Sequence, residues 1–144
     1  ELAAVQQYDN GFYVSANGTW LKSDARFPTR EAKGDLPRTP DLVLNGAVGW
    51  ENDAFSLRLA ATYRDDALQA LEDLEDPAFD IYQDAHVQVD FSAKWTFAEA
   101  WQLAFTAVNL TDEPFYNYFG SSLYNAQYEE YGATYSLGLR WTPW

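Results

Sequence analysis

Several kinds of residue are missing from this 144-residue sequence, and each absence removes a class of protein. It contains no cysteine, which excludes a disulfide framework and a thiolate metal site. With a single histidine, His86, it lacks the parts for a transition-metal site or for nucleophilic catalysis, so we predict no metal ligands and no enzyme. Only 9 cationic residues oppose 22 acidic ones, and a net charge of -13 argues against nucleic-acid binding.

The sequence also lacks methionine and any run of about 20 consecutive apolar residues. The second absence excludes a membrane-spanning helix but not a membrane β-barrel, whose strands carry apolar residues only at every second position. The chain opens ELAAVQQY, without a charged, then apolar, then small-residue leader. We therefore expect it to be part of a longer polypeptide.

Alternation of apolar and polar side chains recurs along this chain, which is 47% hydrophobic and 17% aromatic. In AFSLRLAATYR, every second residue from Phe55 to Tyr63 is apolar, and Arg58 and Arg64 lie between or beside them. Such alternation is typical of strands with two different faces. We predict an all-β fold of about seven antiparallel strands, longer than those of most soluble sheets. The first is partial, and the others lie in GFYVSANGTWLK, DLVLNGAVGW, AFSLRLAATYR, AHVQVDFSAKWT, WQLAFTAVNL and YGATYSLGLRW.

The predicted connections between these strands alternate in length. Short connections fall at residues 9–11, 51–53 and 98–100, and the first two carry the Asn, Asp and Gly of hairpin turns. Long ones run over about residues 27–40, 65–84 and 111–130. All short turns therefore lie at one end of the sheet and all long loops at the other, as in barrels with short periplasmic turns and long extracellular loops.

Aromatic residues mark both ends of the predicted strands. Five of the six tryptophans lie beside short turns or at the end of the last strand, and a soluble β-sandwich gives no reason for this gathering. Trp20 and Tyr63 lie eight residues further along their strands, roughly 20 Å away in a tilted barrel. Two aromatic girdles at the membrane interfaces are therefore predicted. Their members are Trp20, Trp50, Tyr63, Trp95, Trp101, Trp141 and Trp144.

Three stretches of the sequence resemble a known family. AVNLTDEPFYNYFG, residues 107–120, and QYEEYGATYSLGLRW, residues 127–141, closely resemble the last two strands of TonB-dependent outer-membrane receptors. RTPDLVLNGAVGWE, residues 38–51, resembles the strand that enters the membrane two hairpins earlier. The resemblance implies that residues 1–144 are the carboxy-terminal portion of a 22-stranded barrel in the outer membrane of a Gram-negative bacterium.

This resemblance also implies partners and an activity. Such receptors hold a plug domain inside the barrel, and TonB pulls on the plug to admit a ligand bound outside the cell. The plug, the TonB box and most strands are absent from this sequence, so the remainder of the same receptor is an expected partner. Outer-membrane lipid, lipopolysaccharide and the barrel-assembly machinery are the others. A structural or adhesive barrel without energised transport is the alternative, and a soluble acidic β-domain is a third hypothesis.

Polar residues of the strands and loops supply candidate site residues. If the apolar faces meet lipid, the polar faces point into the barrel, where side chains meet the ligand path or form a solvated wall against the plug. The predicted lumen-facing residues are Arg58, Arg64, His86, Gln88, Asp90, Lys94 and Arg140. The loop over residues 65–84 holds eight carboxylates, which are solvated acid or, alternatively, oxygen ligands for Ca²⁺, although the EF-hand spacing is missing. Within it, ALQALEDLED has the pattern of a short helix.

The last long loop is rich in aromatic residues, which hold flat ligand faces and hydroxyl groups or, alternatively, belong to the outer girdle and loop packing. The predicted ligand-binding residues are Tyr116, Tyr118, Phe119, Tyr124 and Tyr128. A carbohydrate and a ferric siderophore both fit this description. The segments NLTDEP, residues 109–114, and QYEEYG, residues 127–132, resemble a receptor subgroup often tied to glycan uptake, which favours the carbohydrate.

The final strand carries an apolar row that ends on an aromatic residue. Its members, Tyr135, Leu137, Leu139 and Trp141, resemble the signal that the barrel-assembly machinery recognises. Pro143 has no N–H to donate and is expected to stop strand pairing just before the end.

Overall fold

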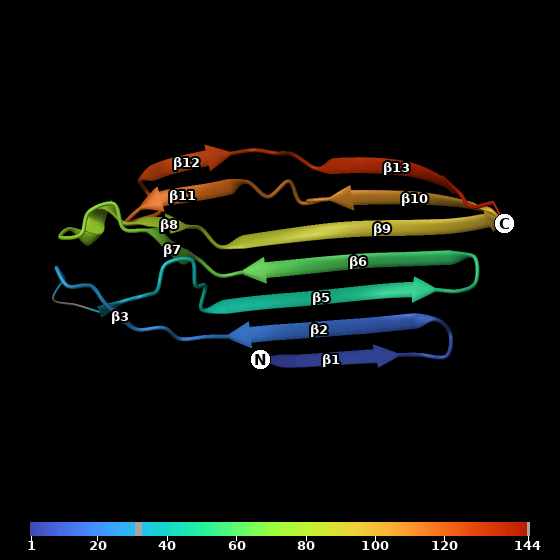
Figure 1. The fold of residues 1–144 in the computed structure, drawn as a ribbon, viewed down its shortest axis with the longest axis horizontal. Helices are drawn as coiled ribbons and strands as arrows, with labels where there is room; N and C mark the ends of the chain where they lie inside the picture. The colour runs from blue at the N-terminus through green and yellow to red at the C-terminus, as the bar shows by residue number, and fades with distance from the viewer. Residues whose placement is uncertain (31–32, 144) are drawn as a thin grey trace.

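The computed structural model describes residues 1–30 and 33–143, and its main feature is a seven-stranded antiparallel sheet (Figure 1). The strands follow the order β1-β2-β5-β6-β9-β10-β13. Their bounds are β1 Leu2–Gln7, β2 Phe12–Trp20, β5 Leu42–Glu51, β6 Phe55–Arg64, β9 His86–Ala98, β10 Trp101–Val108 and β13 Thr134–Trp141. The prediction of seven antiparallel strands is confirmed.

Register gives this sheet one apolar and one polar face, because directly paired residues in neighbouring strands point to the same side. Leu59 pairs with Val48 on one neighbour and with Phe91 on the other, so apolar side chains extend across the strands. One position further along, Arg58 pairs with Gly49 and Ser92 on the opposite face. The alternation in the sequence is thus preserved through the sheet.

The short and long connections lie at opposite ends of the sheet, as predicted (Figure 1). In the first short turn Gly11 has a φ of 87°, in the left-handed region that glycine enters without strain. In the second, the Asn52 side chain accepts hydrogen bonds from the backbone N–H groups of Ala54 and Phe55, at 2.9 and 2.7 Å. These local bonds stabilise the turns.

Residues 21–41, 65–85 and 109–133, here called the first, second and third long loops, contain further short strands. The second and third together form a four-stranded sheet of order β12-β11-β8-β7, here called the loop sheet. Its strands are β7 Ala67–Ala70, β8 Ile81–Gln83, β11 Phe115–Phe119 and β12 Asn125–Glu129. The first long loop contains β3 Ala25–Arg26 paired with β4 Lys33–Gly34.

The prediction of a helix within ALQALEDLED is wrong. Its first four residues form strand β7, which pairs with β8, and the backbone N–H of Arg38 donates to Leu68 O along the other edge of β7. The second loop instead contains a single turn of 3₁₀ helix at Pro77–Phe79. The Asp76 side chain caps this turn by accepting from the N–H of Ala78 at 2.9 Å.

Few side chains are buried, and the largest fully buried one lies in the long loops. Among the described residues of the main sheet, Ala47, Gly49 and Ala107 are buried, while Asp80 of the second loop is 1% exposed. No helix within the described residues is long and apolar enough to cross a membrane.

Candidate ligand-binding site

The polar face of the main sheet carries all seven residues predicted to face the lumen. Asp90 accepts hydrogen bonds from Gln88 Nε2 at 2.9 Å and from the backbone N–H of Asn109 at 3.0 Å. Arg64 donates to Gln83 Oε1 of the loop sheet at 2.9 Å. Within the described part of the chain no ion pair joins the charged residues of this face, so hydrogen bonds organise it.

Exposed apolar side chains cover the opposite face. Phe12, Val48, Leu137 and Leu139 are between 50% and 72% exposed. A continuous apolar surface of this kind marks contact with a membrane or with another apolar partner.

The aromatic residues predicted for the girdles lie at the two ends of this apolar face. At the short-turn end, Trp101 stacks on Trp141 and Phe55 stacks on Trp95, with ring centroids 6.0 and 5.9 Å apart. Trp50 belongs to this end and donates from Nε1 to Asn10 O at 3.0 Å. Trp20 and Tyr63 lie at the long-loop end, and Trp144 lies outside the described residues.

The apolar row of the final strand is exposed along its length. Tyr135, Leu137, Leu139 and Trp141 are each at least 59% exposed, and they pair with Ala107, Phe105, Leu103 and Trp101 of β10. The candidate assembly signal is therefore an accessible stripe along strand β13.

Three of the five predicted loop aromatics lie together on one face of the loop sheet. Register joins Tyr128 to Tyr116 and Tyr118 to Tyr82, and Tyr116 lies beside Tyr118. Neighbouring ring centroids are 6.1, 6.0 and 5.6 Å apart along this series, here called the tyrosine row. Tyr82 comes from the second long loop and was not among the predicted site residues.

The other two predicted loop aromatics lie elsewhere. Phe119 pairs with Ile81, one position out of phase with Tyr118, and therefore lies on the opposite face of the loop sheet. Tyr124 is 66% exposed in the turn between β11 and β12. Asn117 shares the face of Phe119, is 6% exposed, and its Oδ1 has no hydrogen-bond partner among the described residues.

The tyrosine row has a carboxylate at its centre. The Tyr118 hydroxyl donates to Asp66 Oδ2 at 3.2 Å. Partial burial, with the charge of Asp66 and this hydrogen bond, raises the pKa of Tyr118 to about 12. Partial burial also raises the pKa of Asp66 above its ordinary value, although the hydrogen bond from Tyr118 opposes that shift.

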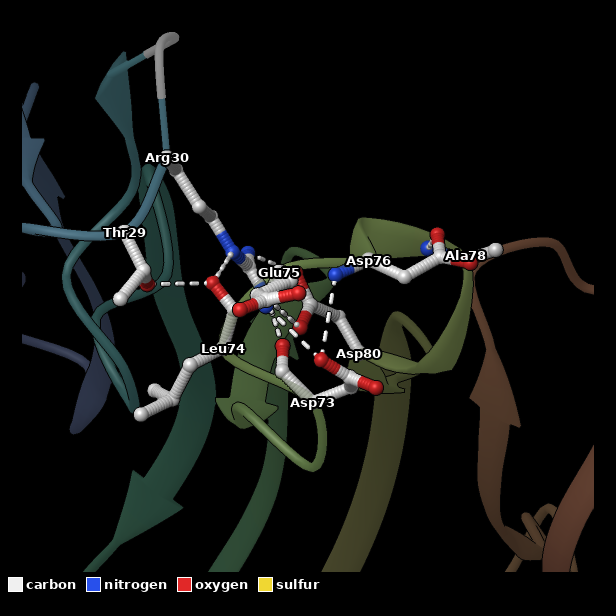
Figure 2. Close-up of polar contacts among 8 residues, drawn as sticks. All are labelled: Thr29, Arg30, Asp73, Leu74, Glu75, Asp76, Ala78 and Asp80. Atoms are coloured by element: carbon white, nitrogen blue, oxygen red, sulfur yellow. Dashed lines mark hydrogen bonds and ion pairs between the residues drawn. The ribbon is translucent and has the colours of Figure 1, made fainter.

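A buried ion pair joins the first long loop to the second (Figure 2). Arg30 donates from Nη1 and Nη2 to the two carboxylate oxygens of Asp80, at 2.5 and 2.6 Å. The same guanidinium also donates to the backbone oxygens of Asp73 and Leu74 (Figure 2). The hydrogen bond to Asp80 raises the pKa of Arg30 above its ordinary value. Such bidentate pairing fixes both partners in orientation.

Asp80 also connects to the third long loop, because its backbone oxygen accepts from the N–H of Gly120 at 2.8 Å. A cavity of 470 Å³ adjoins this junction. Phe27 lies on its first-loop side, and Leu68 and Tyr82 contribute from the loop sheet. Its volume falls within the range of small-ligand pockets.

Three of the eight carboxylates of the second long loop, those of Asp65, Asp73 and Asp76, accept hydrogen bonds from backbone N–H groups of the same loop. Asp73 Oδ1 accepts from the N–H groups of Glu75 and Asp76, at 2.8 and 3.2 Å, which lowers the pKa of Asp73. Across residues 1–30 and 33–143, no three acidic or histidine side chains gather in a metal-holding group. Ca²⁺ binding stays a prediction.

The family model described as TonB dependent receptor-like, beta-barrel matches residues 1–110. The chain belongs to this family. The TonB-dependent receptor family comprises outer-membrane β-barrel receptors rather than enzymes, and membership accounts for one lipid-compatible face and one polar face on the same sheet.

Solved ferric enterobactin receptors share the fold of this chain. A mutant of the ferric enterobactin receptor from Pseudomonas aeruginosa superposes with a TM-score of 0.69 at 17% identity, over 95% of this chain and 21% of that one. A second mutant, in complex with enterobactin, gives 0.70 at 16% identity, over 96% and 21%. The chain therefore spans about a fifth of the length of these receptors. A search among curated protein sequences gives no significant match.

Proposed function

We propose that this chain is part of an outer-membrane active transporter, which binds an extracellular nutrient and imports it with energy delivered through TonB. The observation that carries the proposal is the seven-stranded sheet itself. Its faces differ in polarity, and its short and long connections lie at opposite ends, in a chain of the TonB-dependent receptor family.

In this transporter, residues 1–144 form the carboxy-terminal portion of a 22-stranded barrel. Strands β1 and β13 each have one strand neighbour within the described residues, and an open edge in lipid would leave N–H and C=O groups unpaired. The remaining strands of the receptor close these edges. The plug then lies against the polar face, which carries Arg58 and Lys94, and TonB acts on the plug.

The long loops bind the nutrient on the extracellular side. The tyrosine row supports either a glycan or a ferric siderophore, because both present flat faces and oxygen atoms to aromatic rings and hydroxyl groups. The fold similarity to a ferric enterobactin receptor supports the siderophore, whereas the resemblance of NLTDEP and QYEEYG to a receptor subgroup often tied to glycan uptake supports the glycan.

Growth of the source bacterium on single nutrients tests this function. Deleting the complete receptor gene should abolish growth on one scarce glycan or on one ferric siderophore as sole iron source, and deleting TonB should have the same effect. Complementation with the full receptor should restore growth only when TonB is present. Equal uptake with and without TonB would contradict energised transport and favour a structural or adhesive barrel.

A further inference from the structure

We infer that the cavity between the first long loop and the loop sheet binds an uncharged, hydroxyl-rich ring ligand, a carbohydrate unit, and excludes anionic iron chelates. This inference rests on the proposed uptake function and decides between its two ligand classes. It depends on the shape of the cavity, on the pairing of its charged side chains and on the charge of the surrounding loops.

The apolar part of the cavity is largely aromatic and comes from the first long loop and the loop sheet. Phe27 of the first loop, with Leu68 of β7 and Tyr82 of β8, lines the 470 Å³ space. Aromatic rings stack on the C–H faces of sugars and bury them from water. Beyond Tyr82 the tyrosine row continues through Tyr118 and Tyr116, with rings about 6 Å apart. A chain of sugar rings can therefore extend from the cavity along the row.

The cations of the cavity are already neutralised by the protein. Arg30 is paired with Asp80, and the Lys33 Nζ lies 2.9 Å from Asp24 Oδ2. The Arg30 guanidinium donates to both carboxylate oxygens of Asp80 and to the backbone oxygens of Asp73 and Leu74. These four hydrogen bonds leave it little capacity to bind a ligand anion. Among the described residues that line the cavity, an anionic ligand would thus meet no uncommitted positive charge.

The acids of the cavity are, by contrast, uncommitted to cations. Asp35 and Glu75 line it and form no ion pair among the described residues. Their oxygens can accept hydrogen bonds from sugar hydroxyl groups, which Arg or Lys cannot do. The same oxygens repel the oxygens of an anionic chelate.

The whole loop end of the molecule reinforces this selection. The three long loops contain 16 of the 22 acidic residues and 5 of the 9 cationic ones, so they account for 11 of the 13 net negative charges. Salt screens such repulsion beyond about 8 Å at physiological ionic strength, but Asp35 and Glu75 line the cavity itself. Electrostatics therefore favours a neutral ligand over an anion.

Binding to the full-length receptor in detergent micelles tests the ligand class. The probes are a panel of neutral plant and microbial oligosaccharides, acidic oligosaccharides of the same lengths, and ferric enterobactin as an anionic chelate. We expect at least one neutral oligosaccharide to bind, with an affinity that changes little with salt, and the anionic probes not to bind. Tighter binding of any anionic probe than of every neutral one, or no binding of neutral probes, would overturn the ligand class.

Substitutions in the same receptor test the location. Phe27→Ala and Tyr82→Ala should each weaken binding of the neutral oligosaccharide by roughly tenfold, whereas Tyr82→Phe keeps the ring and should bind nearly as the parent does. Phe79→Ala is the matched control, because this side chain is 54% exposed in the same loop region and lies outside the cavity. Unchanged affinity in Phe27→Ala and Tyr82→Ala receptors that reach normal outer-membrane levels would show that the ligand binds elsewhere.

Two further results separate this inference from the uptake function. Combining Asp35→Asn with Glu75→Gln should increase binding of the acidic oligosaccharides, because it removes two negative charges from the cavity. No increase would contradict the electrostatic argument even if uptake is TonB-dependent. If the cavity variants lose binding while uptake proceeds without TonB, the site stands and the transport proposal fails.

Discussion

At the scale of single residues, Arg30 reaches from the first long loop into a ring of oxygen atoms on the second (Figure 2). Its side chain is 10% exposed and that of Asp80 is 2% exposed, so loss of one partner leaves the other charge buried and unpaired. The exposed pair of Lys33 and Asp24, at 50% and 63%, lacks this property. Removing one partner should therefore cost much more stability in the buried pair than in the exposed pair.

Asp80→Ala should release the first long loop from the second. We expect backbone amides of the first loop to exchange with deuterium roughly tenfold faster or more in the variant, measured by mass spectrometry on the full receptor. Asp24→Ala removes the exposed pair and should change exchange by much less. Equal protection in the parent and in Asp80→Ala would show that the ion pair does not hold the loops together.

Tyr118 gives a prediction for pH dependence. With a pKa of about 12, against an ordinary value of about 10, its neutral form is favoured in the folded protein. Its stabilising effect is therefore complete below pH 10 and is lost as the pH rises through 12. Asp66→Asn removes the nearby charge and should lower this pKa, although partial burial still raises it.

Ultraviolet titration of the full receptor measures this ionisation. The difference between the parent and Tyr118→Phe isolates one phenol, and the same difference in an Asp66→Asn background should shift to lower pH. Coincident difference curves would show that Asp66 does not control Tyr118.

At the scale of elements, alternation predicted the main sheet because the signal is local. Each long strand, such as Phe55–Arg64, carries its two faces in its own sequence. The loop sheet has no such signal, because its strands are three to five residues long and β8 pairs with β11 across more than 30 residues. Tyr82 was missed for this reason, since it lies in an acidic segment remote from the other tyrosines in sequence. The helix predicted for residues 67–76 failed because edge pairing of β7 outweighed a weak helical pattern.

The first short turn makes a prediction about strand assembly. A Cβ at Gly11 would lie 2.1 Å from Glu51 O, and φ there is 87°, so Gly11→Ala combines a backbone clash with roughly 1–2 kcal/mol of conformational strain. Gly132 has a φ of 73° but no atom within 4 Å of such a Cβ, so Gly132→Ala isolates the strain. Outer-membrane levels of folded receptor should fall strongly for Gly11→Ala and slightly for Gly132→Ala. Similar levels would show that the clash is relieved by movement of β5.

The final strand makes a second prediction about assembly. Deleting residues 141–144 removes the Trp101–Trp141 stack and the end of the exposed apolar row, so we expect little receptor to reach the outer membrane. Ser136→Ala, on the polar face of the same strand, is the control and should assemble normally. Heat-modifiable mobility of the receptor on gels measures the folded fraction. Normal assembly of the truncated receptor would show that this row is not part of the recognised signal.

At the scale of the whole molecule, polarity and charge vary along two perpendicular directions. Across the sheet, an apolar face opposes a polar one, as in the walls of the family's barrels. Along the strands, most of the negative charge lies in the long loops, remote from the short turns (Figure 1). Both directions could be assigned from the sequence, the first because it repeats every two residues and the second because short and long connections alternate along the chain. The convergence of three loops on Asp80 depends on contacts between distant segments.

The orientation of the chain in the membrane follows from these two directions and can be tested because the sequence has no cysteine of its own. Leu123 is 86% exposed in the third long loop, and Asp53 is exposed in a short turn at the other end. In a receptor without other cysteines, Leu123→Cys should react with a membrane-impermeant maleimide in intact cells. Asp53→Cys should react only after the outer membrane is permeabilised, because short turns face the periplasm. Labelling of Asp53→Cys alone in intact cells would invert the orientation and remove the loops from the ligand-binding side.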